Sequence, residues 1–214
     1  VSGRNLSDTA ENAIKVAVRQ LKAAGSKAVV VTGINDVDAQ SLVLSINEAL
    51  NSEVADNEAP RKIRQGNDKA VAKLISDMKA NALSGIIMAG VNPVYTLPNG
   101  DEFAESLKKL DFAVSFTMKE DETALNTRYV AATPHYLESW GDVEMKKGHY
   151  SVMQPTIRPL FDTRQFQDAL LKWTGNEKTY YEYIKETWST NILGLGTTWD
   201  KAVHDGVYKT SGAV

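Results

Sequence analysis

The chain contains no cysteine, and this absence excludes several kinds of chemistry. Without thiols it forms no disulfide, holds no iron–sulfur cluster through thiolates, and offers no cysteine ligand to molybdenum or zinc. Long apolar runs are also missing, since none approaches the roughly 20 residues that span a bilayer, and we expect no direct membrane insertion. The net charge of −3 gives no electrostatic reason to expect nucleic acid as a partner.

What remains is ordinary for a globular protein. Hydrophobic residues make up 43% and charged residues 24% of the 214 residues, enough for one large domain with a buried core. No signal peptide is recognisable at Val1, and the opening Val-Ser-Gly-Arg reads as the start of an excised piece. We therefore expect the chain to be a fragment of a longer protein.

Strand and helix patterns alternate along the chain and predict an α/β fold. Apolar residues at helical spacing, preceded by capping residues at Ser7–Thr9, Asn35 or Asp36, and Asn67 or Asp68, indicate early helices; later ones are expected over 103–110, 164–174, 177–189 and 197–206. Apolar runs indicate strands over 27–32, 85–89, 112–117 and 129–132. This order predicts a Rossmann-like parallel sheet with helices on both faces and a C-terminal helical extension. Strands 27–32 and 85–89 are expected to be neighbours, with these residues buried: Val29, Val30, Val31, Ile86, Ile87, Val114 and Phe116.

The predicted domain organisation places the Rossmann-like domain at residues 1–163 and the helical extension, packed on it, at 164–214. Prolines and glycines interrupt residues 133–163, which we expect to be irregular, with a hairpin around Lys146-Lys147-Gly148. Aromatic residues crowd 173–188 without a basic patch beside them. Such a group indicates core or a domain contact rather than a platform for nucleic-acid bases.

Polar residues follow two of the predicted strands. Gly90-Val91-Asn92-Pro93 ends the strand at 85–89, and Asp121-Glu122-Thr123 follows the strand at 112–117. Because parallel strands end at a common edge, where α/β proteins bind ligands, these residues predict a crevice. Gly33 and Gly90 could let a nucleotide approach the backbone; the alternative is that both are turns that need an unusual φ. Neither lies in a Gly-x-Gly-x-x-Gly pattern, so an ordinary NAD site is not expected.

The same segments resemble a known family. Gly90-Val91-Asn92-Pro93 resembles the G-x-N-P loop of molybdopterin oxidoreductases, and Asp121-Glu122-Thr123-Ala124 resembles their [TD]-E-T-A segment. Tyr129 to Glu138 is similar to the family segment that follows. The sequence from His135 to Asp142 resembles that of the B subunit of alternative complex III, a quinol-oxidising respiratory complex, and of its polysulfide-reductase-like relatives.

The resemblance implies where a cofactor would lie. In molybdopterin enzymes the equivalent domain holds part of a molybdopterin guanine dinucleotide, and iron–sulfur clusters lie in another part of the same subunit. The candidate cofactor-binding residues are Gly33, Gly90, Asn92, Pro93, Asp121, Glu122 and Thr123. No segment matches a molybdenum ligand, and the closer relatives carry no molybdenum cofactor in this domain. We therefore expect no cofactor, no catalytic residue and no metal ligand in this chain.

The resulting hypothesis is a scaffold domain of a respiratory electron-transfer complex, without its own redox centre. Its expected partners are other domains of the same subunit and neighbouring subunits, and its expected location is periplasmic, membrane-associated through those partners. Two alternatives stay open: a cofactor-binding domain of an active molybdopterin oxidoreductase, and a stand-alone α/β domain that binds a small molecule.

A further question concerns three side chains in the irregular segment. His135 lies three residues before Glu138, a spacing that could ligate a metal, and Glu138 with Asp142 could act as an acid–base pair. The competing interpretation is that His135 and Glu138 hydrogen-bond the backbone, because Trp140-Gly141 does not suit a regular helix. We favour the backbone interpretation.

Overall fold

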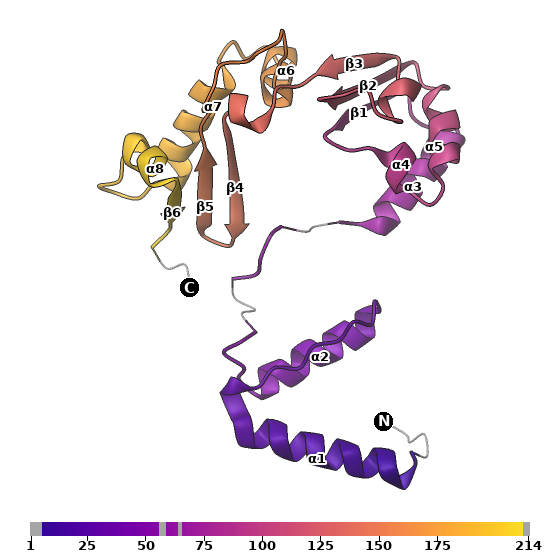
Figure 1. Ribbon diagram of the computed structural model, residues 1–214, viewed down its shortest axis with the longest axis vertical. Coiled ribbons are helices and arrows are strands. Elements are labelled where there is room, and N and C mark those ends of the chain that lie inside the picture. Colours follow the sequence, from indigo (N-terminus) through magenta and orange to yellow (C-terminus); the bar gives the residue numbers. More distant parts are fainter. Residues whose placement is uncertain (1–5, 56–58, 64–65, 212–214) are drawn as a thin grey trace. The chain divides into compact units, whose positions relative to one another are not determined.

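The computed structural model describes residues 6–55, 59–63 and 66–211. The chain divides into two compact units, Val1–Pro60 and Arg61–Val214, whose helices and strands are labelled in Figure 1. None of the helices in the described segments is long and apolar enough to cross a membrane. The domain boundary expected at residue 163 stays a prediction.

The N-terminal unit contains two helices, α1 (Asp8–Ala24) and α2 (Val37–Ala49), with a short 3-10 turn η1 (Gly25–Lys27) after the first. Each α-helix begins at an expected capping residue. The Ser7 hydroxyl accepts a hydrogen bond from the Ala10 N–H at 3.3 Å, and the Asp36 carboxylate accepts one from the Ala39 N–H at 2.9 Å. These caps satisfy backbone donors that the first turn of a helix leaves without partners.

The strand predicted over residues 27–32 is absent, and this prediction is wrong. Val31 is 83% exposed, Val29 is 39% exposed and Val30 is only partly buried. The side chain of Asn47 takes the place of a strand partner, because its Oδ1 accepts from the Val30 N–H at 2.7 Å and its Nδ2 donates to the Val30 carbonyl at 2.9 Å. The Ser52 hydroxyl donates to the Ala28 carbonyl at 2.6 Å. Side chains of α2 and of the residues after it therefore bond backbone groups of this β-branched run that a neighbouring strand would otherwise bond.

The second unit is built on a parallel sheet in the order β1 (Gly85–Ala89), β2 (Phe112–Thr117), β3 (Tyr129–Ala132). Helices α3 (Asp68–Lys79) and α5 (Gly100–Leu107) pack on one face, and α6 (Phe166–Trp173) packs on the other. The short helix α4 (Pro93–Thr96) precedes α5, and the 3-10 turns η2 (Ala124–Asn126) and η3 (Tyr136–Glu138) flank β3. The predicted α/β class, a parallel sheet with helices on both faces, is confirmed.

The core of this sheet lies around its middle strand. Val114 and Phe116 of β2 are 5% and 3% exposed, as predicted. Ile87 is 45% exposed, so its predicted burial is wrong, and Ile86 is only partly buried. The reason is the position of β1, which pairs only with β2 among the described strands and so forms an edge of the sheet.

A second sheet, antiparallel, contains β4 (Gly141–Lys146), β5 (His149–Met153) and β6 (Val207–Lys209). The hairpin expected around Lys146-Lys147-Gly148 is confirmed, with Gly148 at φ 74°; strand β6 was not expected. Against this sheet pack α7 (Tyr180–Thr187), a π-helical turn η4 (Trp188–Ile192) and α8 (Trp199–Asp205). Of the aromatic residues over 173–188, Trp188 is 0% exposed and Tyr180 and Tyr181 pack against the same core, as predicted, whereas Trp173 and Tyr183 are exposed. Trp199, 5% exposed, belongs to this core as well.

The Glu144 carboxylate holds the β4–β5 turn together. It forms an ion pair with Lys62 and accepts a hydrogen bond from the Gly148 N–H at 2.8 Å. The Lys62 hydrogen bond and then the Gly148 N–H lower the pKa of Glu144 below its ordinary value. Burial, followed by the charge of Glu144, raises the pKa of the neighbouring Tyr150.

This lowered pKa predicts a pH dependence of stability. Because the folded pKa of Glu144 lies below the ordinary value of 4.5, the contribution of its charge is complete above that value and is lost as pH falls through the folded pKa. Glu144→Gln should lower the free energy of unfolding at about pH 7, and the difference from the parent should shrink toward about pH 3. Urea denaturation at a series of pH values measures it; a difference that stays constant with pH would contradict the assignment.

The unequal burial of neighbouring residues in β1 predicts unequal effects of truncation. Met88 is 5% exposed and Ile87 is 45% exposed. Met88→Ala should lower the free energy of unfolding by about 2–5 kcal/mol, whereas Ile87→Ala should lower it by about 1 kcal/mol or less. Denaturant titration of both variants provides the measurement. Equal large losses would mean that β1 is covered on both faces.

Candidate functional site

A cleft of about 560 Å³ lies at the carboxyl ends of the parallel strands. We call it the strand-end cleft; its lining includes Gly90 and Asn92 after β1, Thr117 at the end of β2 with Met118, Lys119 and Asp121 after it, and Thr133 after β3. This is the edge at which the sequence predicted a crevice. Of the candidate residues, Gly90, Asn92 and Asp121 line it directly.

The two motif loops beside this cleft are joined by Asn92 and Thr123. The Thr123 hydroxyl donates to Asn92 Oδ1 at 2.7 Å, and the Thr123 N–H donates to the same oxygen at 3.2 Å. The Thr123 hydroxyl also accepts from the Val94 N–H at 3.1 Å. Thr123 is 0% exposed, so every polar group of its side chain has a partner inside the protein. We call this arrangement the Asn92–Thr123 pair.

The two carboxylates before Thr123 reinforce the same loops. Asp121 Oδ1 accepts from the Thr123 N–H at 3.1 Å and from the Ala124 N–H at 2.9 Å. The Glu122 carboxylate accepts from Asn92 Nδ2 at 2.6 Å, and this hydrogen bond is the main cause of the lowered pKa of Glu122. The carboxylates of Asp121 and Glu122 thus accept hydrogen bonds from groups of the same two loops and stabilise the loop conformation.

The remaining candidates have backbone roles. Gly90 has φ +65° and its N–H donates to the Phe116 carbonyl at 2.9 Å, which confirms the interpretation of this glycine as a turn with an unusual φ. Pro93 opens α4, where its missing N–H removes no helical hydrogen bond. Gly33 lies outside the set of glycines with positive φ, and residues 27–32 form no strand. The expected strand end and unusual φ at Gly33 were therefore wrong, and a role of Gly33 in binding a cofactor stays a prediction.

The chemistry of the strand-end cleft does not fit a dinucleotide pyrophosphate. Lys119 is the one Lys or Arg among the described residues of its lining, and the Asp121 carboxylate opposes it. Val91, Met118 and Phe166 make much of the remaining wall apolar. The Gly90 N–H, which could bind a phosphate oxygen, is already bonded to a carbonyl. A doubly charged phosphate would meet few free donors here.

The question about His135, Glu138 and Asp142 is answered by their partners. Glu138 accepts from the His135 N–H at 3.3 Å, and His135 Nδ1 accepts from the Leu137 N–H at 3.3 Å, so the backbone interpretation is confirmed. Asp142 accepts from the Tyr180 hydroxyl at 3.1 Å and from Trp188 Nε1 at 2.9 Å. Burial and then this carboxylate raise the pKa of Tyr180. In the described segments no three His, Asp or Glu side chains gather as metal ligands would.

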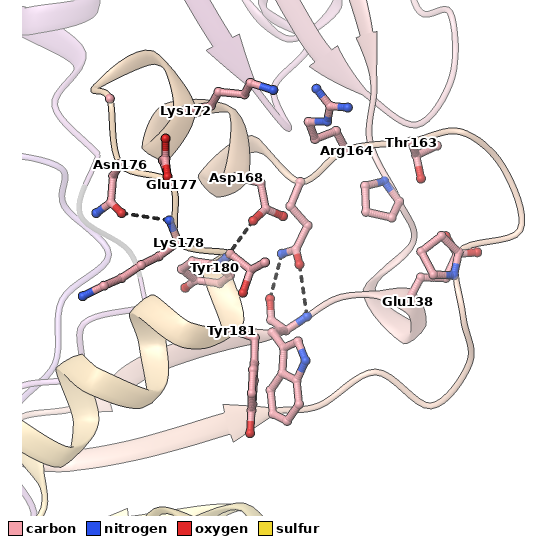
Figure 2. Close-up of a pocket in the computed structure, with 16 residues that line it drawn as sticks. Glu138, Thr163, Arg164, Asp168, Lys172, Asn176, Glu177, Lys178, Tyr180 and Tyr181 are labelled. Atoms are coloured by element: carbon pink, nitrogen blue, oxygen red, sulfur yellow. Dashed lines mark hydrogen bonds between the residues drawn. The ribbon is translucent and has the colours of Figure 1, made fainter.

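Sequence reasoning missed a second cleft, of about 760 Å³, shown in Figure 2. It lies between the residues around α6 and the start of α7, and two side chains of the α6 region shape it. Gln165 donates to the Trp140 carbonyl at 2.8 Å and accepts from its N–H at 3.3 Å. Asp168 accepts from the Tyr180 N–H at 2.7 Å. The only signal for it in the sequence is the density of polar and aromatic residues over 163–181.

Comparison with known proteins gives one informative similarity. A scan against models of protein families finds no match. Among curated proteins, the chain is similar to the molybdopterin-binding-like subunit of menaquinone reductase from Nitratidesulfovibrio vulgaris, with 38% identity over 108 residues. The match covers 49% of this chain and 16% of the relative. The chain thus spans about one sixth of the length of this relative, and the similarity is to a subunit named molybdopterin-binding-like.

The Asn92–Thr123 pair predicts the effect of removing one hydroxyl. Thr123→Val keeps the shape of the side chain but leaves Asn92 Oδ1 with one donor fewer and the Val94 N–H without its acceptor. We expect the free energy of unfolding to fall by about 1–3 kcal/mol. Thr123→Ser, the matched control, keeps the hydroxyl and should lose less. Thermal or urea denaturation of both variants decides; equal losses would show that the methyl group, not the hydrogen bonds, matters.

Proposed function

We propose that the chain is a scaffold domain of a molybdopterin-oxidoreductase-like subunit and has no redox centre of its own. The observation that carries the proposal is the Asn92–Thr123 pair. The side chains at the motif positions of the resemblance are bonded to one another, so the motifs serve the fold of the loops. A domain built in this way presents its surface to other proteins rather than its cleft to a cofactor.

Charge supports the same proposal. A guanine dinucleotide carries a pyrophosphate that needs several cations or free N–H donors. The strand-end cleft offers Lys119 beside the acidic Asp121, and the Gly90 N–H is engaged. Holding such a cofactor there would require opening the loops and adding positive charge.

The proposed setting follows from the similarity and from the composition. The relative is named as a subunit of menaquinone reductase, and we propose a comparable role in a respiratory complex that oxidises or reduces quinones, of the alternative complex III type. Iron–sulfur clusters would belong to another part of the same subunit, because this chain has no cysteine. Its partners would be that part and neighbouring subunits, on the periplasmic side, with membrane association through them.

A second candidate function is the cofactor-binding domain of an active molybdopterin oxidoreductase. Two observations favour it: the strand-end cleft lies where α/β proteins bind ligands, and the relative is named as a molybdopterin-binding-like subunit. The two candidates differ in what the cleft should do with a guanine nucleotide.

Calorimetry with guanosine diphosphate separates them. The scaffold proposal predicts that guanosine diphosphate does not bind with a dissociation constant below about 1 mM, which corresponds to a binding free energy of roughly −4 kcal/mol. A dissociation constant of about 1 μM or tighter, roughly −8 kcal/mol, would favour the cofactor-binding candidate. Adenosine diphosphate serves as the control, because binding that recognises the guanine base should exceed binding of a diphosphate in general.

A further inference from the structure

A smaller cleft of about 320 Å³ lies on the α6 face of the parallel sheet, between β3 and α6. We call it the β3–α6 cleft. Its lining comes from the strands, from the segment before α6 and from α6 itself: Phe116, Ala131, Ala132, Asp162, Thr163, Arg164, Ala169, Lys172 and Trp173. Its volume is at the lower end of the roughly 300–1,000 Å³ typical of ligand pockets, which suits a ligand with a single ring.

The floor of this cleft is apolar and partly aromatic. Phe116 and Ala169 are 3% and 8% exposed and belong to the core on this face of the sheet. Trp173 packs edge-on against Phe116, with ring centroids 5.8 Å apart, yet it remains 54% exposed. A large indole that is held in place by the core and still open to solvent can contact the ring of a ligand.

The rim of the cleft carries two cations. The backbone N–H of Arg164 donates to the Ala132 carbonyl at 3.1 Å, which ties this residue to the end of β3. Lys172 lies in the last turn of α6. Figure 2 shows both labelled side chains reaching from α6 and the segment just before it, and both line the β3–α6 cleft and the larger cleft beside it.

Among the residues that the structure describes, these two cations have no anionic side chain as a partner. Within residues 6–55, 59–63 and 66–211, neither the Arg164 guanidinium nor the Lys172 ammonium makes an ion pair or a side-chain hydrogen bond. In contrast, Lys178 is paired with Glu186, and Lys201 with Asp205 at 2.8 Å. Asp162 is the one acid in the described lining of the β3–α6 cleft, so the lining carries a net positive charge.

We propose that the β3–α6 cleft binds a small aromatic anion, of the aryl phosphate or aryl carboxylate class. The ring lies over the apolar floor beside Trp173, and the anionic group lies at the rim. Arg164 offers a planar fork of donors that matches two oxygens of a phosphate or carboxylate, and Lys172 adds a second charge. This cleft shares Phe116 with the strand-end cleft but has no residue of the two motif loops in its lining, and the proposal does not rest on the proposed scaffold role.

The test uses phenyl phosphate as the probe, with the full chain followed by ¹H–¹⁵N NMR, so that shifts of the Trp173 indole N–H report on the cleft. We expect saturable shifts at Trp173 and Ala132. Arg164→Gln and Lys172→Gln should each weaken binding by roughly tenfold or more, the ordinary effect of losing a charge-assisted hydrogen bond. Both residues are exposed, so the variants should remain folded, which their thermal unfolding verifies.

Three controls give the outcomes their meaning. Lys209→Gln removes an exposed cation from β6, outside the cleft, and should leave the affinity unchanged. Phenol, which lacks the anion, and inorganic phosphate, which lacks the ring, should each bind at least about tenfold more weakly than phenyl phosphate. The proposal is overturned by the absence of saturable shifts, by equal affinity in the parent and the Arg164→Gln, Lys172→Gln double variant, or by equal binding of either control compound.

Discussion

The hydrogen bond from the Thr123 hydroxyl to Asn92 Oδ1, 2.7 Å long and fully buried at Thr123, fixes how two loops leave the parallel sheet. Through its second contact, with the Val94 N–H, Thr123 also sets the start of α4. The effect extends to α5, because a Cβ on Gly100 would lie 1.9 Å from the Val94 carbonyl oxygen. Only a glycine permits this close approach. The Asn92–Thr123 pair therefore determines the shape of the strand-end cleft. It also sets the path of the chain into α5, which covers the face of the sheet opposite α6.

The second sheet depends on a comparable use of polar side chains that each bond two groups elsewhere in the chain. Asp142 accepts from Tyr180 and Trp188, which joins strand β4 to the two helical segments that cover it. Gln165 bonds both backbone groups of Trp140, so the segment before β4 is joined to the start of α6. In each case one side chain bonds two polar groups that lie far from it in the sequence. Residues that make these contacts, such as Asn92 and Gln165, also line the clefts of this unit, so the contacts hold parts of the cleft walls in place.

The sequence predicted those parts of the fold whose signals are local. Strand 112–117 was found because its apolar run is buried on both faces, and helix starts were found at Ser7, Asp36 and Asn67, where the side chains do cap. The run at 27–32 has the same composition as a strand, but its backbone partner is the Asn47 side chain, a contact that composition does not reveal. The exposure of Ile87 was missed because the edge position of β1 is a property of the whole sheet. For the candidate site, the order of the motifs indicated the correct edge, while the mutual bonding of Asn92 and Thr123, and the cations at Arg164 and Lys172, depend on contacts between distant residues.

Native-state hydrogen exchange at two backbone amides tests the central claim most directly. If the motif loops are held by their own side chains, the N–H groups of Val94 and Thr123, which bond to Thr123 Oγ1 and Asn92 Oδ1, should exchange slowly in the protein without any added nucleotide. Their protection should approach that of the core strand β2, and guanosine diphosphate should not increase it. Exchange at the rate of an unfolded peptide, slowed only when the nucleotide is added, would show that the loops await a cofactor and would contradict the account.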